Sequence, residues 1–391
     1  MKIDILNLSM YNGTMKIGID TFGLEHGKSG LGSYLLSLLE CLPDIEGGQI
    51  ELFGPGADRY TYSSNREFTY KEINVKDDPA AERKWHVKKV DKFCRKNNYD
   101  VVFYTNGCKM IPTKARVPSV AVINSILSVV LAECGFWERK RIVKGLSSMD
   151  CIIASSMYVK KDIIRCGVKC QRIEIVHNGI DHSMFYPDSK VEKTDFADIK
   201  PFAIKKPYII YGSRLQSSDK KHVELIKAFT MFKEKTGLPH RLVLAGEEGA
   251  YAEEVQKAAF DSSAATEIFM TGYFPREGFP ELYRNSEMCV FPSVNEGVGL
   301  PVLEAMATGI PVACAKAGAL PEIAGNNVLY FDSDNIQNMA DCMEQIICDE
   351  KLRKKIVASG VEWAKRFSWE KAAVETVDIV KDVHAARKNT R

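Results

Sequence analysis

The chain has 391 residues, of which 45% are hydrophobic and 27% charged, with a formal net charge of +2. This length allows two hydrophobic cores and the composition excludes a disordered chain, while the nearly balanced charge gives no field that would attract nucleic acid. Eleven scattered cysteines, several inside apolar runs, fit a reducing compartment and predict a cytoplasmic protein.

The first strand is predicted at residues 17–20, inside a start-like segment, MKIGIDTFGL, that begins at Met15. Residues 1–14 are therefore expected to be an N-terminal appendage. After this strand comes GKSGLGSY, residues 27–34, whose Gly30 and Gly32 would let the backbone closely approach a diphosphate or an acceptor. Its glycine spacing matches neither a phosphate-binding P-loop, which needs one more residue, nor the dinucleotide fingerprint.

Short apolar runs then alternate with segments of helical periodicity, which predicts βαβ units and a parallel sheet. Further strands of this first set are expected at 51–53, 101–104, 120–123, 152–154 and 173–176. The uncharged stretch 117–132 is shorter than the ~20 residues that span a bilayer, and we interpret it as a buried strand with the loop after it. This first domain is predicted to cover residues 15–187.

A second alternating set follows a charged stretch without periodicity, residues 188–206, which is predicted to be a linker. Strands are expected at 208–211, 242–245, 267–270, 288–291, 311–315 and 328–331. They define a second domain, residues 207–367, followed by a helical tail, residues 368–391. The fold class is thus α/β, with two doubly wound, Rossmann-like domains facing each other across a cleft at the carboxyl ends of their strands.

Residues 82–98 carry seven basic and two acidic side chains. On an α-helix, Lys84, Lys88, Lys92 and Arg95 fall on one face, and Val87, Val90, Phe93 and Cys94 fall on another. The basic face is either a solvated surface or a contact with an anionic membrane, at which each cation can contribute ~1 kcal/mol.

The stretch from Cys289 to Gly318, CVFPSVNEGVGLPVLEAMATGIPVACAKAG, predicts a strand, a turn, a helix and a strand. Pro301 fits the first turn of the helix and Gly309 its C-terminus. The helix N-terminus attracts phosphate, and the carboxylates of Glu296 and Glu304 accept hydrogen bonds from sugar and ribose hydroxyls. Together these features predict a nucleotide-sugar site.

This stretch, PSxxEGxGLPxLEAMAxGxPV, closely resembles the retaining glycosyltransferases of family 4, which have the GT-B fold, and the resemblance extends from about Met15 onward. It implies transfer of a sugar from a nucleotide diphosphate sugar, GDP-mannose or a UDP-sugar, to a hydroxyl of a glycan or a lipid-linked acceptor. Retention of the anomeric configuration is implied, as is a last helix that returns to the first domain. The resemblance implies a nucleotide-sugar co-substrate and no cofactor or metal.

The resemblance also implies roles for individual residues. Arg214 and Lys220 match the family's diphosphate-binding pair, and with Glu296 they form the predicted catalytic set. Donor binding is assigned to Gly30, Gly32, Asn124, Gly272, Tyr273, Gly297, Val298, Gly299, Leu300 and Glu304.

One departure from the family keeps other functions open. Asn124 stands where many members have a histidine that contacts the donor sugar. A nucleotide-sugar epimerase or a phosphorylase can use the same fold, and a non-catalytic nucleotide-binding module is a third alternative. The expected partners are the nucleotide sugar and the acceptor, with peripheral contact at the inner face of an anionic membrane and no nucleic acid.

Overall fold

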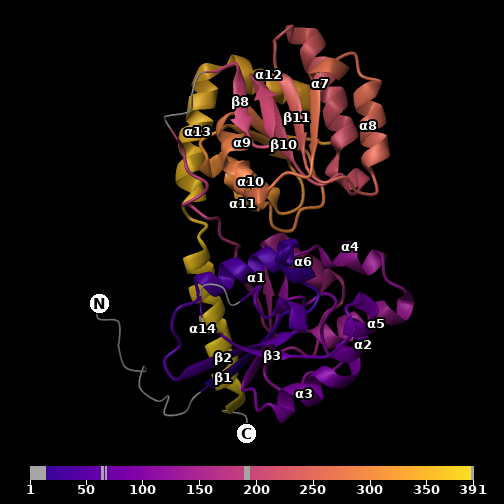
Figure 1. The fold of residues 1–391 in the computed structure, drawn as a ribbon, viewed down its shortest axis with the longest axis vertical. Helices are drawn as coiled ribbons and strands as arrows, with labels where there is room; N and C mark the ends of the chain where they lie inside the picture. The colour runs from indigo at the N-terminus through magenta and orange to yellow at the C-terminus, as the bar shows by residue number, and fades with distance from the viewer. Residues whose placement is uncertain (1–14, 63–65, 67, 189–193, 389–391) are drawn as a thin grey trace. The chain divides into compact units, whose positions relative to one another are not determined.

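The computed structural model describes residues 15–62, 66, 68–188 and 194–388 (Figure 1). The predicted appendage, residues 1–14, lies outside the described residues. The chain forms two compact units, one comprising the residues up to Asn178 together with those from Trp369 onward, the other running from Gly179 to Ser368.

The first unit is built on a seven-stranded, wholly parallel sheet in the order β3-β2-β1-β4-β5-β6-β7. Its strands are β1 (Met15–Asp20), β2 (Gly48–Gly54), β3 (Thr69–Glu72), β4 (Val101–Tyr104), β5 (Ser119–Ile123), β6 (Cys151–Ala154) and β7 (Ile173–Ile175). Strands β4, β5 and β6 are buried along their whole length, as expected for a parallel sheet covered on both faces. β3 was not predicted, because it is a mostly exposed edge strand without an apolar run.

Helices cover both faces of this sheet. They are α1 (Gly30–Glu40), α2 (Pro79–Trp85), the π-helix η3 (His86–Val90), α3 (Asp91–Lys96), α4 (Leu127–Ala132), α5 (Phe136–Leu146), α6 (Met157–Arg165) and α14 (Trp369–Lys388), with 3-10 turns η1 (Glu25–Gly27) and η2 (Gly56–Asp58). On one face, α1 and α14 lie side by side and bury Leu35, Trp369 and Val377 (Figure 1). The other face is covered mainly by α2, α3, α5 and α6.

Two sequence predictions in this unit need correction. Residues 127–132, predicted as a loop, form α4, which buries Leu127 and Leu131. Residues 82–98 do not form one regular α-helix, since the π-helix η3 separates α2 from α3. The predicted faces survive this interruption: Lys84, Lys88, Lys92 and Arg95 are exposed, while Val90 and Cys94 are buried.

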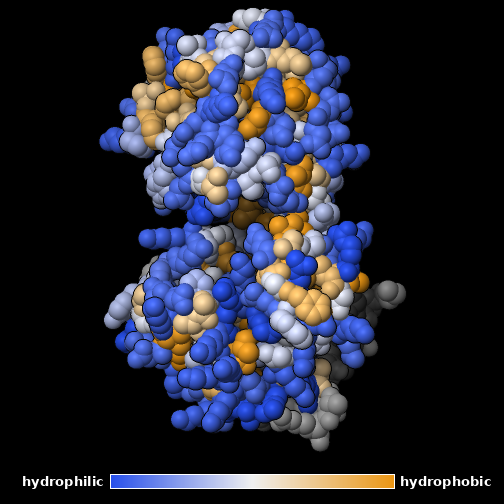
Figure 2. Space-filling model, turned by 90° about the vertical axis from the view of Figure 1, so that its right-hand side faces the viewer, coloured by the Kyte–Doolittle hydropathy of each residue, from blue (hydrophilic) through white to orange (hydrophobic). Residues whose placement is uncertain are grey.

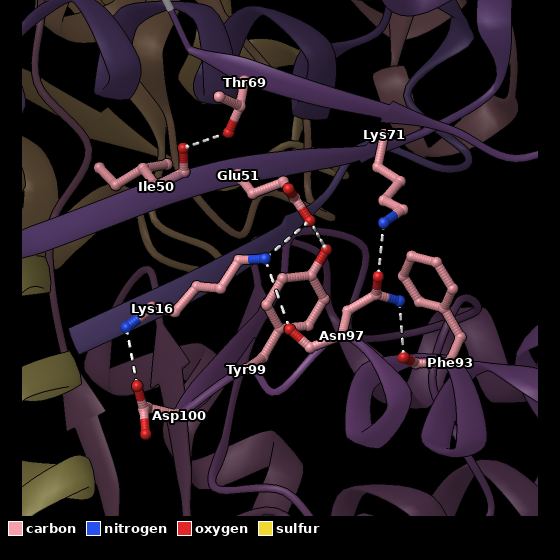
Figure 3. A network of polar contacts seen from close by, with 9 residues as sticks. All are labelled: Lys16, Ile50, Glu51, Thr69, Lys71, Phe93, Asn97, Tyr99 and Asp100. Atoms are coloured by element: carbon pink, nitrogen blue, oxygen red, sulfur yellow. Dashed lines mark hydrogen bonds and ion pairs between the residues drawn. The ribbon is translucent and has the colours of Figure 1, made fainter. Parts of the chain in front are cut away.

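A polar network fixes the end of α3 to the amino-terminal end of the sheet (Figure 3). Lys16 donates its backbone N–H to Asp100 at 2.8 Å, and its ammonium lies 3.3 Å from the carboxylate of Glu51. Tyr99 donates its hydroxyl to the same carboxylate at 2.6 Å. Lys71 on β3 bonds the side chain of Asn97 at 2.6 Å. These contacts position the basic segment against strands β1, β2 and β3.

The second unit has a six-stranded parallel sheet in the order β12-β11-β10-β13-β14-β15 and a separate hairpin, β8-β9. The strands are β8 (Phe196–Ile199), β9 (Phe202–Lys205), β10 (Tyr208–Gly212), β11 (Arg241–Ala245), β12 (Ile268–Gly272), β13 (Met288–Phe291), β14 (Val312–Ala315) and β15 (Leu329–Phe331). The helices are α7 (His222–Thr236), α8 (Ala252–Phe260), α9 (Phe279–Arg284), α10 (Leu300–Ala307), α11 (Leu320–Ala324), α12 (Ile336–Cys348) and α13 (Glu350–Ala364), with 3-10 turns η4 (Ser218–Lys220), η5 (Ala265–Glu267) and η6 (Arg276–Gly278).

The hairpin lies within the stretch expected to lack regular structure. Ala197, Ile199 and Ile204 are buried there. Each strand has only four residues, which is too short a pattern to recognise beside so many charges. The wider prediction of two doubly wound α/β domains is confirmed, because each sheet is parallel and reverses its strand order near its centre.

Candidate functional site

The strand order of the second sheet reverses between β10 and β13, which are neighbours in space but not in sequence. In doubly wound sheets the loops that leave the carboxyl ends of two such strands diverge and form a binding crevice. Here these loops are residues 213–221 and residues 292–299, which carry Arg214, Lys220 and Glu296.

Lys220 and Glu296 come into direct contact. Nζ of Lys220 lies 2.6 Å from Oε1 of Glu296, and the two side chains are 28% and 13% exposed. The hydroxyl of the buried Tyr211 donates to the carbonyl oxygen of Lys220 at 2.9 Å, which fixes the backbone from which the ammonium extends. The structure therefore holds one cation and one carboxylate together at the switch point of the sheet.

The backbone of Glu296 is held by the segment after β14. The N–H of Ala319 donates to the carbonyl oxygen of Glu296 at 2.8 Å. Gly318 has φ +57°, and a Cβ at that position would lie 2.6 Å from the same oxygen. The loop can approach only because residue 318 is glycine. The contact of Gly318 with Glu296 was not predicted from the sequence.

Asp219 ties the two loops together. Its carbonyl oxygen accepts from the N–H of Val294 at 3.0 Å, and its carboxylate accepts from the Asn295 amide at 2.6 Å. Neither Asp219 nor Asn295 was singled out from the sequence, because a contact between loops 75 residues apart leaves no local signal.

Arg214 does not take part in the Lys220–Glu296 contact and pairs with a different carboxylate. Its Nε is 3.6 Å from the carboxylate of Glu247, and both side chains are more than half exposed. Lys221 directs its ammonium to Asp334 at 2.7 Å and to Glu224 at 3.2 Å. Its φ of +58° lies in the left-handed region, which glycine and asparagine adopt more readily than lysine.

Residues 297–300 lead from β13 into α10 as predicted. Gly299, at φ +76°, is the N-cap of the helix, Leu300 is its first residue and Pro301 lies in the first turn. Gly297 is buried and Val298 is half-buried. Pro301 has no N–H, and the N–H groups of Val302 and Leu303 donate to the carbonyl oxygen of Gly299 at 3.1 and 3.4 Å. The start of α10 therefore favours an anion at this end of the sheet chiefly through the positive end of the helix dipole.

Glu304 occupies the second turn of α10 and is almost buried. Its Oε1 accepts from Nη2 of Arg276 at 3.2 Å. Burial raises the pKa of the Glu304 carboxyl, while Arg276 opposes that rise. Arg276 was missed in the sequence, although it lies three residues after Tyr273. Tyr273 itself is exposed, and Gly272 ends β12 at φ +66° with open space around it.

The first unit has a pocket at its own switch point, between β1 and β4. Its volume is about 280 Å³, close to the lower end of the ~300–1,000 Å³ typical of ligand pockets. Asn124 lies in its wall with Ser29, Glu82, Asn106 and Lys109. The structure thus places Asn124 among polar groups that converge on one cavity.

The carboxyl of Glu82 is the least expected group in this pocket. It is 6% exposed and has no hydrogen-bond or ion-pair partner among the residues that the structure describes. Burial first, and then the charge of Asp20, raise its pKa to about 7. In the sequence Glu82 is one of two acids in a basic segment, which concealed it.

A buried pair lies next to Glu82. Nδ1 of His86 lies 2.7 Å from the carbonyl oxygen of Glu82, which can only accept, so Nδ1 donates. Nε2 of His86 lies 2.7 Å from Oδ2 of Asp20, and this second contact needs a proton of its own. His86 therefore donates from both ring nitrogens or shares a proton with Asp20. This contact connects the π-helix to the end of β1.

The two glycines of the first unit that were assigned to donor binding differ in their surroundings. The N–H of Gly32 donates to the side chain of Ser29 at 3.0 Å, and a Cβ on Gly32 would lie 2.6 Å from backbone atoms of Leu24 and Gly27. Gly30, the first residue of α1, has no heavy atom within 4 Å of an added Cβ. Close packing against the preceding loop explains why residue 32 is glycine. Of these two glycines, only Gly30 faces open space.

Models of two protein families match the chain. The model described as glycosyl transferases group 1 matches residues 192–363, which lie entirely within the second unit. The model described as glycosyltransferase family 4 matches residues 28–184, chiefly in the first unit. Together the two matches cover most of the chain.

Curated relatives match parts of the chain. O-antigen chain mannosyltransferase B of Escherichia coli is 32% identical over 157 residues, which are 40% of this chain and 41% of that protein. D-inositol 3-phosphate glycosyltransferase of Xylanimonas cellulosilytica is 25% identical over 242 residues, 60% of this chain and 57% of that protein. The matched region thus spans about half the length of these relatives.

Solved structures match nearly the whole chain. HepE of Anabaena, in complex with UDP and glucose, has a TM-score of 0.73 at 18% identity and covers 94% of this chain and 100% of its own. Sucrose-phosphate synthase of Thermosynechococcus elongatus has a TM-score of 0.72 at 18% identity, with coverage of 95% and 100%. At this identity the likeness concerns the fold.

Proposed function

Because the chain belongs to the glycosyltransferases of group 1 and family 4, with the GT-B fold, we propose that it transfers a sugar from a nucleotide diphosphate sugar to an acceptor hydroxyl with retention of configuration. The observation that carries the proposal is the 2.6 Å contact of Lys220 with Glu296 at the switch point of the second sheet. It joins a cation suited to phosphate with a carboxylate suited to sugar hydroxyls.

The proposed reaction takes place on one face of the sugar. The bond from the anomeric carbon to the diphosphate breaks, the acceptor oxygen bonds to the same face, and the departing phosphate oxygen takes the acceptor's proton. Lys220, Arg214 and the N-terminus of α10 stabilise the negative charge that builds on the leaving diphosphate. Since these groups carry the charge stabilisation, we propose that no divalent metal is needed.

Glu296 is proposed to hold the hydroxyls of the donor sugar and Glu304 those of the ribose. Gly297, Val298, Gly299 and Leu300 bring the donor to the start of α10 through their backbone, and Gly272 and Tyr273 flank the base. Arg276 supports this assignment, because it fixes one oxygen of Glu304 and leaves the other to accept from a ligand hydroxyl.

The acceptor is proposed to be a glycan or a lipid-linked sugar bound at the pocket of the first unit. The amide of Asn106, the ammonium of Lys109 and the carboxyl of Glu82 suit a ring with several hydroxyls. Asn124, in the wall of the same pocket, is proposed to contact the donor sugar, as the resemblance implies. The name of one relative, an O-antigen chain mannosyltransferase, is consistent with a glycan acceptor.

Peripheral attachment at the inner face of the membrane is part of the proposal. Among the described residues, no helix is long and apolar enough to cross a bilayer. Six cations of the α2–η3–α3 segment are exposed and would face anionic lipid: Lys84, Lys88, Lys89, Lys92, Arg95 and Lys96. Each cation near such a surface contributes ~1 kcal/mol.

Donor binding and transfer can be tested in one series. GDP-mannose, UDP-glucose and other nucleotide sugars are added singly, and the melting temperature is measured; the true donor should raise it more than its free nucleotide. Product formation with candidate acceptors then distinguishes transfer from the alternatives. Turnover of the donor without acceptor to an epimeric sugar would indicate an epimerase. Binding without any turnover would indicate a non-catalytic module.

Metal dependence needs its own measurement. Transfer by the native enzyme should persist in excess EDTA. Complete loss of transfer that added Mg²⁺ or Mn²⁺ restores would contradict the proposed charge arrangement.

A further inference from the structure

Two aromatic side chains project from the start of α5. Phe136 is 61% exposed and Trp137 is 80% exposed, and their rings contact each other at 5.4 Å between centroids. Most other large aromatic residues of the first unit are buried in its two core clusters. Two adjacent exposed aromatics form an apolar patch rather than the single exposed residues usual on a surface.

Cations surround this pair. Nζ of Lys140 lies 4.4 Å from the Phe136 ring centroid and 5.8 Å from that of Trp137. Arg139 and Lys144 are also exposed on α5. The opposing charges are Glu138, which is half-buried, and Glu133, which is exposed. Aromatic rings beside lysine and arginine are the composition that settles at a bilayer interface, where rings lie among headgroups and cations meet anionic lipid.

The patch is continuous with the basic segment of α2. The carboxylate of Glu138 lies 3.7 Å from Arg83 of α2 and 3.7 Å from Arg141 of α5. Glu138 is thus occupied by two cations, and α5 starts beside the helix whose Lys84 is exposed. Figure 2 faces the side of the first unit that bears α4 and α5, and apolar groups gather there among hydrophilic ones.

We propose that Phe136 and Trp137, with the exposed cations of α5 and of the α2–η3–α3 segment, form one surface that docks on an anionic bilayer, the two rings entering the headgroup layer. This inference rests on the proposed transfer to a lipid-linked acceptor, which requires the enzyme to reach a membrane. The rings supply contact area and the cations supply attraction that salt weakens.

Tryptophan fluorescence can report this docking directly. The chain has four tryptophans. Trp85 and Trp369 are buried, Trp363 is half-buried, and Trp137 is the one that is mostly exposed. Transfer of Trp137 from water to headgroups should shift the emission to shorter wavelength, while the other three contribute a constant background.

The full-length protein is mixed with vesicles of equal parts phosphatidylglycerol and phosphatidylcholine, or of phosphatidylcholine alone. We expect co-sedimentation and a blue shift with the anionic vesicles only, both weakened by salt.

Trp137→Phe should remove the blue shift and retain sedimentation. Phe136→Ser combined with Trp137→Ser should weaken sedimentation by roughly tenfold or more. Lys84→Glu with Lys88→Glu should weaken it by at least about fivefold per residue.

Phe260→Ser is the matched control, because Phe260 is 85% exposed but lies in the second unit. It should leave vesicle binding unchanged, and all variants should keep the native melting temperature. The proposal is overturned if the native protein stays in the supernatant at low salt, or if it sediments without a shift in Trp137 emission. A blue shift without vesicles that grows with protein concentration would instead assign the patch to a second copy of the chain. Donor-induced thermal shifts without vesicles report on the glycosyltransferase proposal separately.

Discussion

The two switch points of this protein differ in whether their charged side chains are paired. In the second unit Lys220, Glu304 and Arg214 each have an oppositely charged partner within 4 Å. In the first unit the pocket contains Glu82, whose carboxyl has no such partner among the described residues and whose pKa is raised to about 7. A site for a charged diphosphate needs fixed, permanent charges, whereas a site for neutral hydroxyls is better served by groups that can donate or accept.

Breaking the charged contact of the second unit should have the largest effect. Glu296→Gln and Lys220→Ala should each lower turnover by about 100-fold or more, because each removes a preorganised charged group, and should lower the melting temperature little. Steady-state kinetics and thermal unfolding measure the two effects. Lys354→Ala is the matched control, since Lys354 forms an exposed ion pair with Glu350 on α13. Equal losses of rate in all three variants would contradict the assignment.

Replacing one crowded glycine in each unit by alanine should show a further difference between the two units. Gly318→Ala combines a left-handed φ with a clash at the carbonyl of Glu296, so it should lower the free energy of unfolding by about 2–4 kcal/mol and weaken donor binding. Gly32→Ala should destabilise by about 1–3 kcal/mol, because the added Cβ would clash with backbone atoms of Leu24 and Gly27 in the first unit. Gly30→Ala, with open space around it, should not destabilise. Chemical unfolding and a donor titration test each variant.

The unpartnered acid of the first unit should appear in the pH dependence of stability. The folded protein holds the Glu82 proton more tightly than the unfolded chain, whose carboxyl titrates near 4.5. Stability therefore falls as pH rises from about 4.5 to about 7 and is level above that range. Glu82→Gln should abolish this part of the profile. At pH 8 the free energy of unfolding of this variant should be about 1–3 kcal/mol higher than that of the native protein. Parallel profiles of variant and native protein would show that Glu82 is solvated or paired.

The smallest expected effect is a change in stability at Lys221, the residue with a left-handed backbone next to Lys220. Lys221→Asn should raise stability by about 0.5–1 kcal/mol, because asparagine tolerates the left-handed conformation and caps α7. The ion pairs with Asp334 and Glu224 that are lost offset part of this gain. Lys227→Asn, the same exchange inside α7, should lower stability by a few tenths of a kcal/mol. Both are measured by chemical unfolding.

Sequence periodicity located the long buried strands because an interior parallel strand needs a continuous apolar run, as in β5 and β13. It missed β3 and the β8-β9 hairpin, whose few residues are partly exposed. The turn into α10 was predictable, since Gly299 and Pro301 have fixed conformational roles. Arg276 and Gly318 were not, because each acts through a contact with a residue distant in sequence. Glu82 was not, because only the fold shows that its carboxyl is buried.

The path of α14 has a consequence for synthesis of the protein. Trp369, Ala373, Val377 and Val380 of this helix complete a core whose other members come from the first half of the chain. On the ribosome, the first unit must wait for its last helix, while the second unit already has all its residues. The chain should therefore emerge with an unfinished first sheet, its α14 face uncovered, and close that face only after residues 369–388 have left the ribosome.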